Sequence, residues 1–167
     1  MSAIFWGCEK PPKFEQAHQG DKGQPPVILD YYAVQSLRPG KTWNTYLRAK
    51  DEDGDMKYIA ATLHGAGTGY GTSETHLEGE DRAEFAGHLL LETPLDLNFV
   101  TSMESLTMEI FIRDWAGNKS KAINLPLTFA EHETSESIPG KLQDAAKHRL
   151  GAIDIDIPSS QERGDRK

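Results

Sequence analysis

The chain has 167 residues, of which 37% are hydrophobic, and a formal net charge of -8. An acidic chain repels the phosphate backbone, so nucleic acid is excluded as an expected partner. No apolar run approaches the roughly 20 residues that a membrane-spanning helix needs. The single cysteine, Cys8, excludes an internal disulfide.

Residues 1–26 are predicted to form a flexible tether, because prolines, glycines and polar residues follow one another there without a hydrophobic period. The apolar stretch Ile4-Phe5-Trp6 runs into Gly7-Cys8, but the basic segment and long apolar segment of a complete secretory signal are missing. Gly-Cys before a Pro/Gln/Gly-rich stretch resembles the junction of a bacterial lipoprotein. The resemblance implies a lipid on Cys8 and a start upstream of Met1. The alternative is a flexible terminus with an incidental cysteine.

Five segments alternate apolar and polar residues with the period of two that is typical of half-buried strands: 43–49, 57–63, 85–91, 106–113 and 121–129. A short strand near residue 28 and another near 70–76 bring the expected number to six or seven. The connections are too short for parallel crossovers, so the sheets are expected to be antiparallel. Short strands with frequent turns favour an all-β sandwich over residues 27–130.

Residues 51–55, DEDGD, place four carboxylates in one short stretch. The helix–loop–helix calcium motif is excluded, because its glycine and glutamate positions hold Met56 and Thr62 and the flanks have the period of a strand. Asp-Gly between alternating segments predicts a tight hairpin turn. Like charges in a turn repel one another unless solvent or a cation screens them. Two interpretations therefore remain open: a plain turn, or a weak Ca²⁺ site.

The ligands of that Ca²⁺ site would be Asp51, Asp53 and Asp55, with Asp114 as a fourth if its turn lies nearby. Ca²⁺ takes roughly 6–8 oxygens, more than this loop supplies alone. No other cofactor is expected.

Residues 114–118, DWAGN, are predicted to form the turn between the two strongest strand patterns, with Asp114 accepting hydrogen bonds from backbone N–H groups. Together, LRAKDEDGDMKYIAATL and MEIFIRDWAGNKSKAINLPLTF resemble the bacterial immunoglobulin-like and cadherin-like modules, over about residues 27–130. The resemblance implies an immunoglobulin-like sandwich that is extracellular or at the cell surface. It also implies a role in spacing, display or adhesion, with Ca²⁺ bound at aspartate-rich loops in some members.

The glycine-rich stretch 64–76 is not a phosphate-binding loop, because no helical pattern follows it. A mobile loop or a strand crossing is expected instead. Tyr70 at its centre and Trp115 in the 114–118 turn are the candidate exposed contact residues. For Trp115 the alternative is packing over its own hairpin. Neither the histidines nor the serines form a pattern that indicates a metal site or a nucleophile.

Residues 131–167 are expected to be a polar tail. Within it, Leu142, Ala145, Ala146 and Leu150 make an apolar stripe at helical spacing, which predicts a short helix over 141–150.

These features favour a non-enzymatic binding or spacer module at the cell surface or in the periplasm. Its partner would be a protein or a cell-surface component, and it would touch a membrane only through a lipid on Cys8. One alternative is a structural subunit of a phage or envelope assembly, whose tails would become ordered on binding. Another is an enzyme with its site on the 64–84 loop, which would need ionisable groups with shifted pKa values in a pocket. The oligomeric state is left open.

Overall fold

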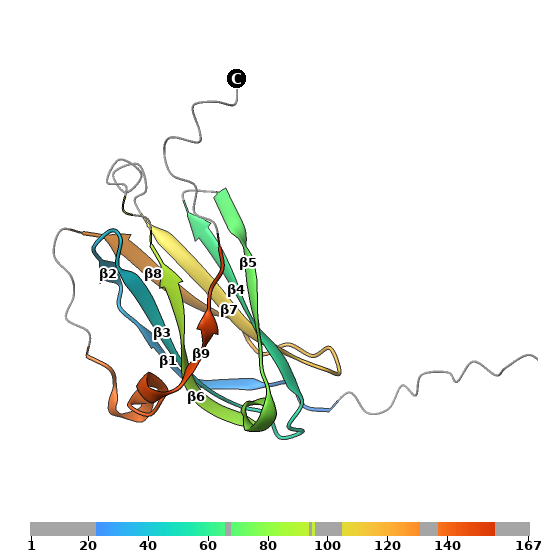
Figure 1. Ribbon diagram of the computed structural model, residues 1–167. Helices are drawn as coiled ribbons and strands as arrows, with labels where there is room; N and C mark the ends of the chain where they lie inside the picture. The colour runs from blue at the N-terminus through green and yellow to red at the C-terminus, as the bar shows by residue number, and fades with distance from the viewer. Residues whose placement is uncertain (1–22, 66–67, 94, 96–104, 131–136, 156–167) are drawn as a thin grey trace, which may run out of the picture.

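The computed structural model describes residues 23–65, 68–93, 95, 105–130 and 137–155. Two β-sheets pack face to face as a sandwich (Figure 1). One sheet has the order β1-β3-β6-β9, formed by Val27–Ala33, Thr42–Lys50, Glu84–Glu92 and Arg149–Ala152. The other has the order β2-β8-β7-β4-β5, formed by Ser36–Leu37, Ile123–Phe129, Leu106–Asp114, Met56–Gly65 and Thr68–His76. The first strand changes sheets between β1 and β2, and the chain has an immunoglobulin-like sandwich fold.

The alternating pattern decides which side chains form the core. In β3, Trp43, Thr45, Leu47 and Ala49 all face inward and are fully buried, as predicted. The inward residues predicted in β6 and β7 are buried as well, and in β7 the alternation is perfect from Leu106 to Asp114. The indole Nε1 of Trp43 donates to the backbone oxygen of Val34 at 2.9 Å, so the largest core side chain also holds the crossing from β1 to β2.

Three expectations about the strands are wrong. The described part contains nine strands rather than six or seven. Two pairs are parallel rather than antiparallel, namely β2 with β8 and β6 with β9. The 51–55 segment is not a hairpin turn, because β3 and β4 belong to different sheets and this segment crosses between them.

The sandwich does not end at residue 130. Residues 137–155, named the strap from here on, return along the outer face of the β1-β3-β6 sheet and add β9 to its edge (Figure 1). In place of one helix over 141–150, the strap has two single 3₁₀ turns, Gly140–Leu142 and Ala145–Lys147, followed by β9. Leu142 and Ala145 are buried against Tyr46, with Tyr32 packed beside them, in a second apolar cluster.

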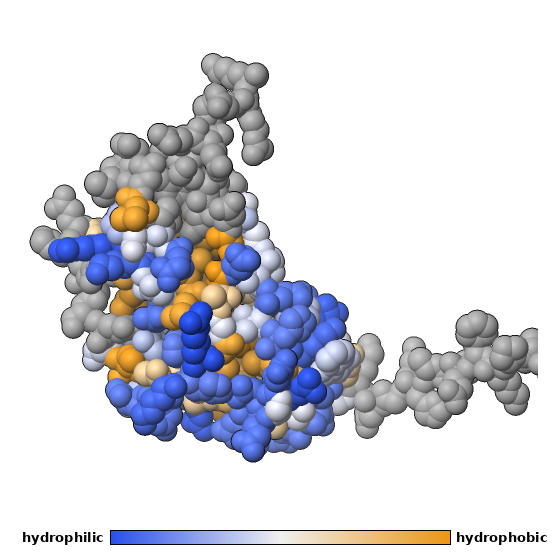
Figure 2. All heavy atoms as spheres, viewed as in Figure 1, coloured by the Kyte–Doolittle hydropathy of each residue, from blue (hydrophilic) through white to orange (hydrophobic). Residues whose placement is uncertain are grey.

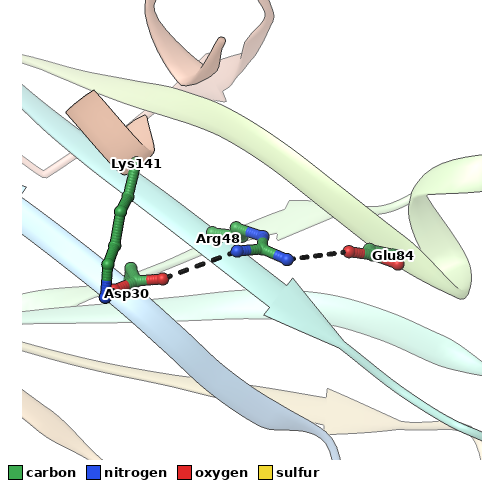
Figure 3. Close-up of polar contacts among 4 residues, drawn as sticks. All are labelled: Asp30, Arg48, Glu84 and Lys141. Carbon is green, nitrogen blue, oxygen red and sulfur yellow. Dashed lines mark hydrogen bonds and ion pairs between the residues drawn. The ribbon is translucent and has the colours of Figure 1, made fainter. Parts of the chain in front are cut away.

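Polar contacts tie the strap to the sheet. Arg48 on β3 lies between Asp30 on β1, at 3.7 Å, and Glu84 on β6, at 3.5 Å (Figure 3). Lys141 of the strap reaches the other oxygen of Asp30 at 3.6 Å. These pairs are partly exposed, so each contributes little free energy. They nevertheless align the strap with the strands beneath it.

The chain enters and leaves the sandwich at opposite ends (Figure 1). At the lower end in that view, Gly23 lies against the carboxylate of Asp53, in the loop between β3 and β4. At the upper end, Ile155 lies next to Gly71 of β5. In the part of the chain described here, no helix is long and apolar enough to cross a membrane.

Candidate functional site

The lower end of the sandwich carries the carboxylates that the sequence singled out. We call residues 51–55 together with the 114–118 turn the acidic pole. The 51–55 segment is a compact turn. The backbone N–H of Gly54 donates to the backbone oxygen of Asp51 at 3.3 Å, and the backbone N–H of Asp55 donates to the side-chain Oδ2 of Asp51 at 3.1 Å. Gly54 has a φ of +70°, which favours glycine. Residues 51–55 therefore do form a turn, but it joins two sheets and not the two strands of the predicted hairpin.

Asp114 organises the neighbouring turn, as predicted. Its side chain is buried, and its two oxygens accept hydrogen bonds from Asn118, at 2.7 Å from the backbone N–H and at 2.8 Å from the side-chain amide. Gly117 supplies the positive φ that the turn requires. The N–H of Trp115 donates to the backbone oxygen of Asp55 at 3.0 Å, so the two parts of the acidic pole are joined directly.

Two carboxylate oxygens of the acidic pole lack a hydrogen-bond partner within the described part of the chain. Asp51 is only 3% exposed, and its Oδ1 is buried without a partner. The Oδ1 of Asp55 is buried and unpartnered too. The pKa of Asp55 is raised to about 6, first by burial, then by a hydrogen bond with the Asp51 side chain and by repulsion from Asp114, Asp51 and Asp53. The acidic pole therefore concentrates negative charge that the protein does not fully neutralise.

The fit of this site to a metal ion is incomplete. Across the described ranges, no group of three or more His, Cys, Asp or Glu side chains is arranged to hold a metal. Asp51 and Asp55 offer free oxygens, whereas both oxygens of Asp114 are engaged by Asn118. Asp53 accepts a hydrogen bond from the backbone N–H of Gln24 and so also fastens the start of the sandwich. Ca²⁺ binding by the four aspartates stays a prediction.

Trp115 is exposed, as one of the two interpretations predicts. Its side chain is 60% exposed, at the tip of the 114–118 turn. The ammonium of Lys57 lies 4.5 Å from the centre of the indole ring, within the range of a cation–π contact. The sequence gives no sign of this pair, because it depends on the register that sets Met56 opposite Asp114 across β4 and β7.

The prediction of an exposed Tyr70 is wrong. Residues 68–76 form strand β5, which confirms the strand expected near 70–76 rather than a mobile loop, and the half-buried Tyr70 packs against the main core. A Cβ on Gly65 would come within 2.9 Å of the Tyr70 ring, which shows how closely the ring is packed. Cys8 and the expected tether up to residue 22 lie outside the described residues.

Two surface grooves accompany the described strands. One, of about 470 Å³, lies between Tyr31–Gln35 and Asn124–Pro126. The other, of about 530 Å³, is lined by Gln24, Pro25, Val27, Leu29, Lys50 and Glu52. Asp55, the carboxyl group with the raised pKa, lines neither groove. The arrangement of ionisable groups in a pocket that an enzyme would need is therefore not found in these two grooves.

Comparison with known proteins gives matches only among solved structures. No family model and no curated protein matches the sequence. A PKD domain of an M14-like peptidase from Thermoplasmatales archaeon SCGC AB-540-F20 is 17% identical, with a TM-score of 0.43, over 65% of this chain and 99% of its own. A CARDB domain from Pyrococcus furiosus, solved in complex with di-metal ions, is 10% identical, with a TM-score of 0.34, over 64% of this chain and 86% of its own. At these sequence identities and TM-scores, no activity of either domain is attributed to this chain. Its immunoglobulin-like fold is assigned from its own strand order.

Proposed function

We propose that the protein is a non-enzymatic spacer and binding module of the cell envelope. The observation that supports this role is the path of the chain, which enters beside Asp53 and leaves beside Gly71 at the other end of the sandwich. A domain built in this way holds the segments on its two sides apart by the length of its sheets. The extra strand β9 serves the same path, because it carries the chain from the strap to the far end.

Cell fractionation tests the role in the envelope. The full chain, with an epitope tag at its C-terminus, is expressed in its source organism from its natural gene context. We expect it in the envelope fraction and open to protease added outside the cytoplasm. If Cys8 carries a lipid, Cys8→Ser moves the protein from the membrane to the soluble part of that fraction. Recovery of both forms in the cytoplasm would contradict the proposal, and an unchanged membrane association of Cys8→Ser would remove only the lipid anchor.

A second candidate function, Ca²⁺ binding at the acidic pole, is favoured by the unpartnered buried oxygens of Asp51 and Asp55. An oxygen-rich, negatively charged loop is the chemistry that Ca²⁺ prefers, with backbone oxygens and water completing the roughly 6–8 ligands. Because Asp53 holds the backbone of Gln24, an ion bound here would also stiffen the junction with the preceding segment.

Thermal melts of the purified chain test the ion. We expect Ca²⁺ to raise Tm relative to EDTA, by an amount that corresponds to about 2.7 kcal/mol at a hundredfold excess over Kd. Asp51→Asn should lose the response, whereas Asp154→Asn, an exposed carboxylate at the other end of the sandwich, should keep it. Equal Tm values with EDTA and with millimolar Ca²⁺ would show that the acidic pole is a turn and not an ion site.

A further inference from the structure

Trp115 presents a large aromatic surface to solvent in a fixed position. Its backbone N–H is held by Asp55, and the turn that carries it is closed by the two hydrogen bonds from Asn118 to Asp114. A side chain on such a turn has little backbone freedom to lose when a partner binds, which favours binding. Core packing does not account for Trp115, because the residue is 60% exposed.

The loop that the Trp115 backbone contacts is rich in carboxylates. Glu52 and Asp53 are exposed in the adjoining loop, and the half-buried Asp55 contacts the Trp115 backbone. The buried Asp51 adds a carboxylate oxygen that no group among the described residues satisfies. The lower end of the molecule is mostly hydrophilic in Figure 2, whereas apolar residues gather nearer the middle of that face.

The protein already places a cation on this ring. Lys57 Nζ lies 4.5 Å from the ring centre of Trp115 and 5.8 Å from that of Tyr58. The ring is therefore positioned to accept positive charge. Lys57 is a flexible side chain, and a guanidinium group would form a better contact, since it is planar, stacks on indole and pairs with carboxylates through several N–H groups.

We propose that Trp115, Glu52 and Asp53 form a docking site for a basic protein segment, in which an arginine side chain stacks on the indole and displaces Lys57. A basic segment is favoured over a neutral sugar because of the carboxylates in the adjoining loop and the net charge of -8. The inference does not depend on the spacer role, because a spacer needs no ligand at its end and a docking site needs no particular path of the chain.

A peptide titration tests the site. The probe is a short peptide of alternating glycine and arginine, and the reporter is the indole N–H signal of Trp115 in a ¹H–¹⁵N spectrum, assigned by its loss in Trp115→Phe. We expect Trp115→Ala to raise Kd about tenfold, as a partly desolvated cation–π contact predicts. Glu52→Gln and Asp53→Asn should each raise Kd about two- to fivefold at low salt, and Asp154→Asn should leave it unchanged.

Lys57→Gln separates a binding role of the ring from a structural one. The substitution frees the ring and removes a positive charge, so it should lower Kd, whereas a merely structural Trp115–Lys57 pair predicts no gain. The proposal fails if Trp115→Ala binds the peptide as well as the unchanged chain does, or if Lys57→Gln weakens binding. It also fails if a peptide with neutral citrulline in place of arginine, or a neutral oligosaccharide, binds as tightly as the arginine peptide. Circular dichroism of each variant shows that the sandwich is intact.

Discussion

The surroundings of Asp55 in the acidic pole oppose the ionisation of its carboxyl group. Its pKa is about 6 in the folded protein and 3.8 in the absence of those surroundings. The folded state therefore holds the proton more tightly than the unfolded chain. It follows that the contribution of Asp55 to stability is fully present below about pH 4 and is lost as the pH rises through about 6.

This linkage predicts that Asp55→Asn stabilises the protein at neutral pH. A shift of this size corresponds to an upper limit of about 3 kcal/mol, which solvent around the half-buried group reduces to roughly 1–2 kcal/mol. Urea denaturation with EDTA present should show this gain in the free energy of unfolding at pH 7 and almost none at pH 4. Asp154→Asn serves as the control with no pH-dependent difference. A variant less stable than the unchanged chain at pH 7 would show that the Asp55 carboxylate makes a net favourable contact.

Single residues were predictable where one local rule decides their place. Alternation alone places Trp43, Leu47 and Ile110 in the core, and the short reach of an aspartate side chain explains the capping role of Asp114. Tyr70 was not predictable, because the glycines around it suit a loop as well as an edge strand. The contact between Lys57 and the Trp115 ring could not be predicted from the sequence for a different reason. It depends on the register between β4 and β7, which are distant in the chain.

At the scale of elements, the strap shows how one sequence pattern fits two structures. Leu142, Ala145 and Leu150 are spaced as in a helix, but the first two pack on the outer face through separate 3₁₀ turns. Leu150 instead lies over Gly87, where a Cβ would come within 2.5 Å of it. Three of the four predicted apolar positions therefore pack on the sheet, whereas Ala146 is exposed, and the backbone conformation depends on the sheet beneath. β2 has only two residues, too few for any pattern.

The strap is expected to detach more easily than the sandwich unfolds. Leu142→Ala removes a buried side chain from the small second cluster. We expect it to lower the free energy of unfolding by about 2–3 kcal/mol, the lower part of the range for such substitutions. Hydrogen exchange should quicken at the amides of His88 and Ile153, which bond to His148 and Leu90, and change little at Ile112 in β7. Lys141→Ala removes only the exposed ion pair with Asp30. It should lower the free energy of unfolding by less than about 1 kcal/mol. An equal increase of exchange throughout the protein would mean that the strap and the sandwich unfold as one unit.

At the scale of the whole molecule, the sequence predicts a sandwich, but it does not predict the two strands that pair in parallel, β2 and β9. Short connections correctly indicate antiparallel pairing where two strands of one sheet follow each other directly, as β5 follows β4 and β8 follows β7. The two parallel pairs have different origins: β2 follows β1 directly after the chain has crossed to the other sheet, whereas β9 follows the strap. A local sequence pattern cannot predict these placements. They depend on which sheet edge and which outer sheet face remain uncovered once the other strands have paired.

The path of the two ends also determines how the domain would respond to mechanical load. A pull on the chain before Val27 acts along β1, and a pull beyond Ala152 acts along β9 in the opposite direction. Both terminal strands are then loaded in shear against β3 and β6, so their ladder hydrogen bonds share the force and must yield together rather than one at a time. A tether under tension would thus meet its resistance in the four-stranded sheet, while the five-stranded sheet stays outside the direct line of force.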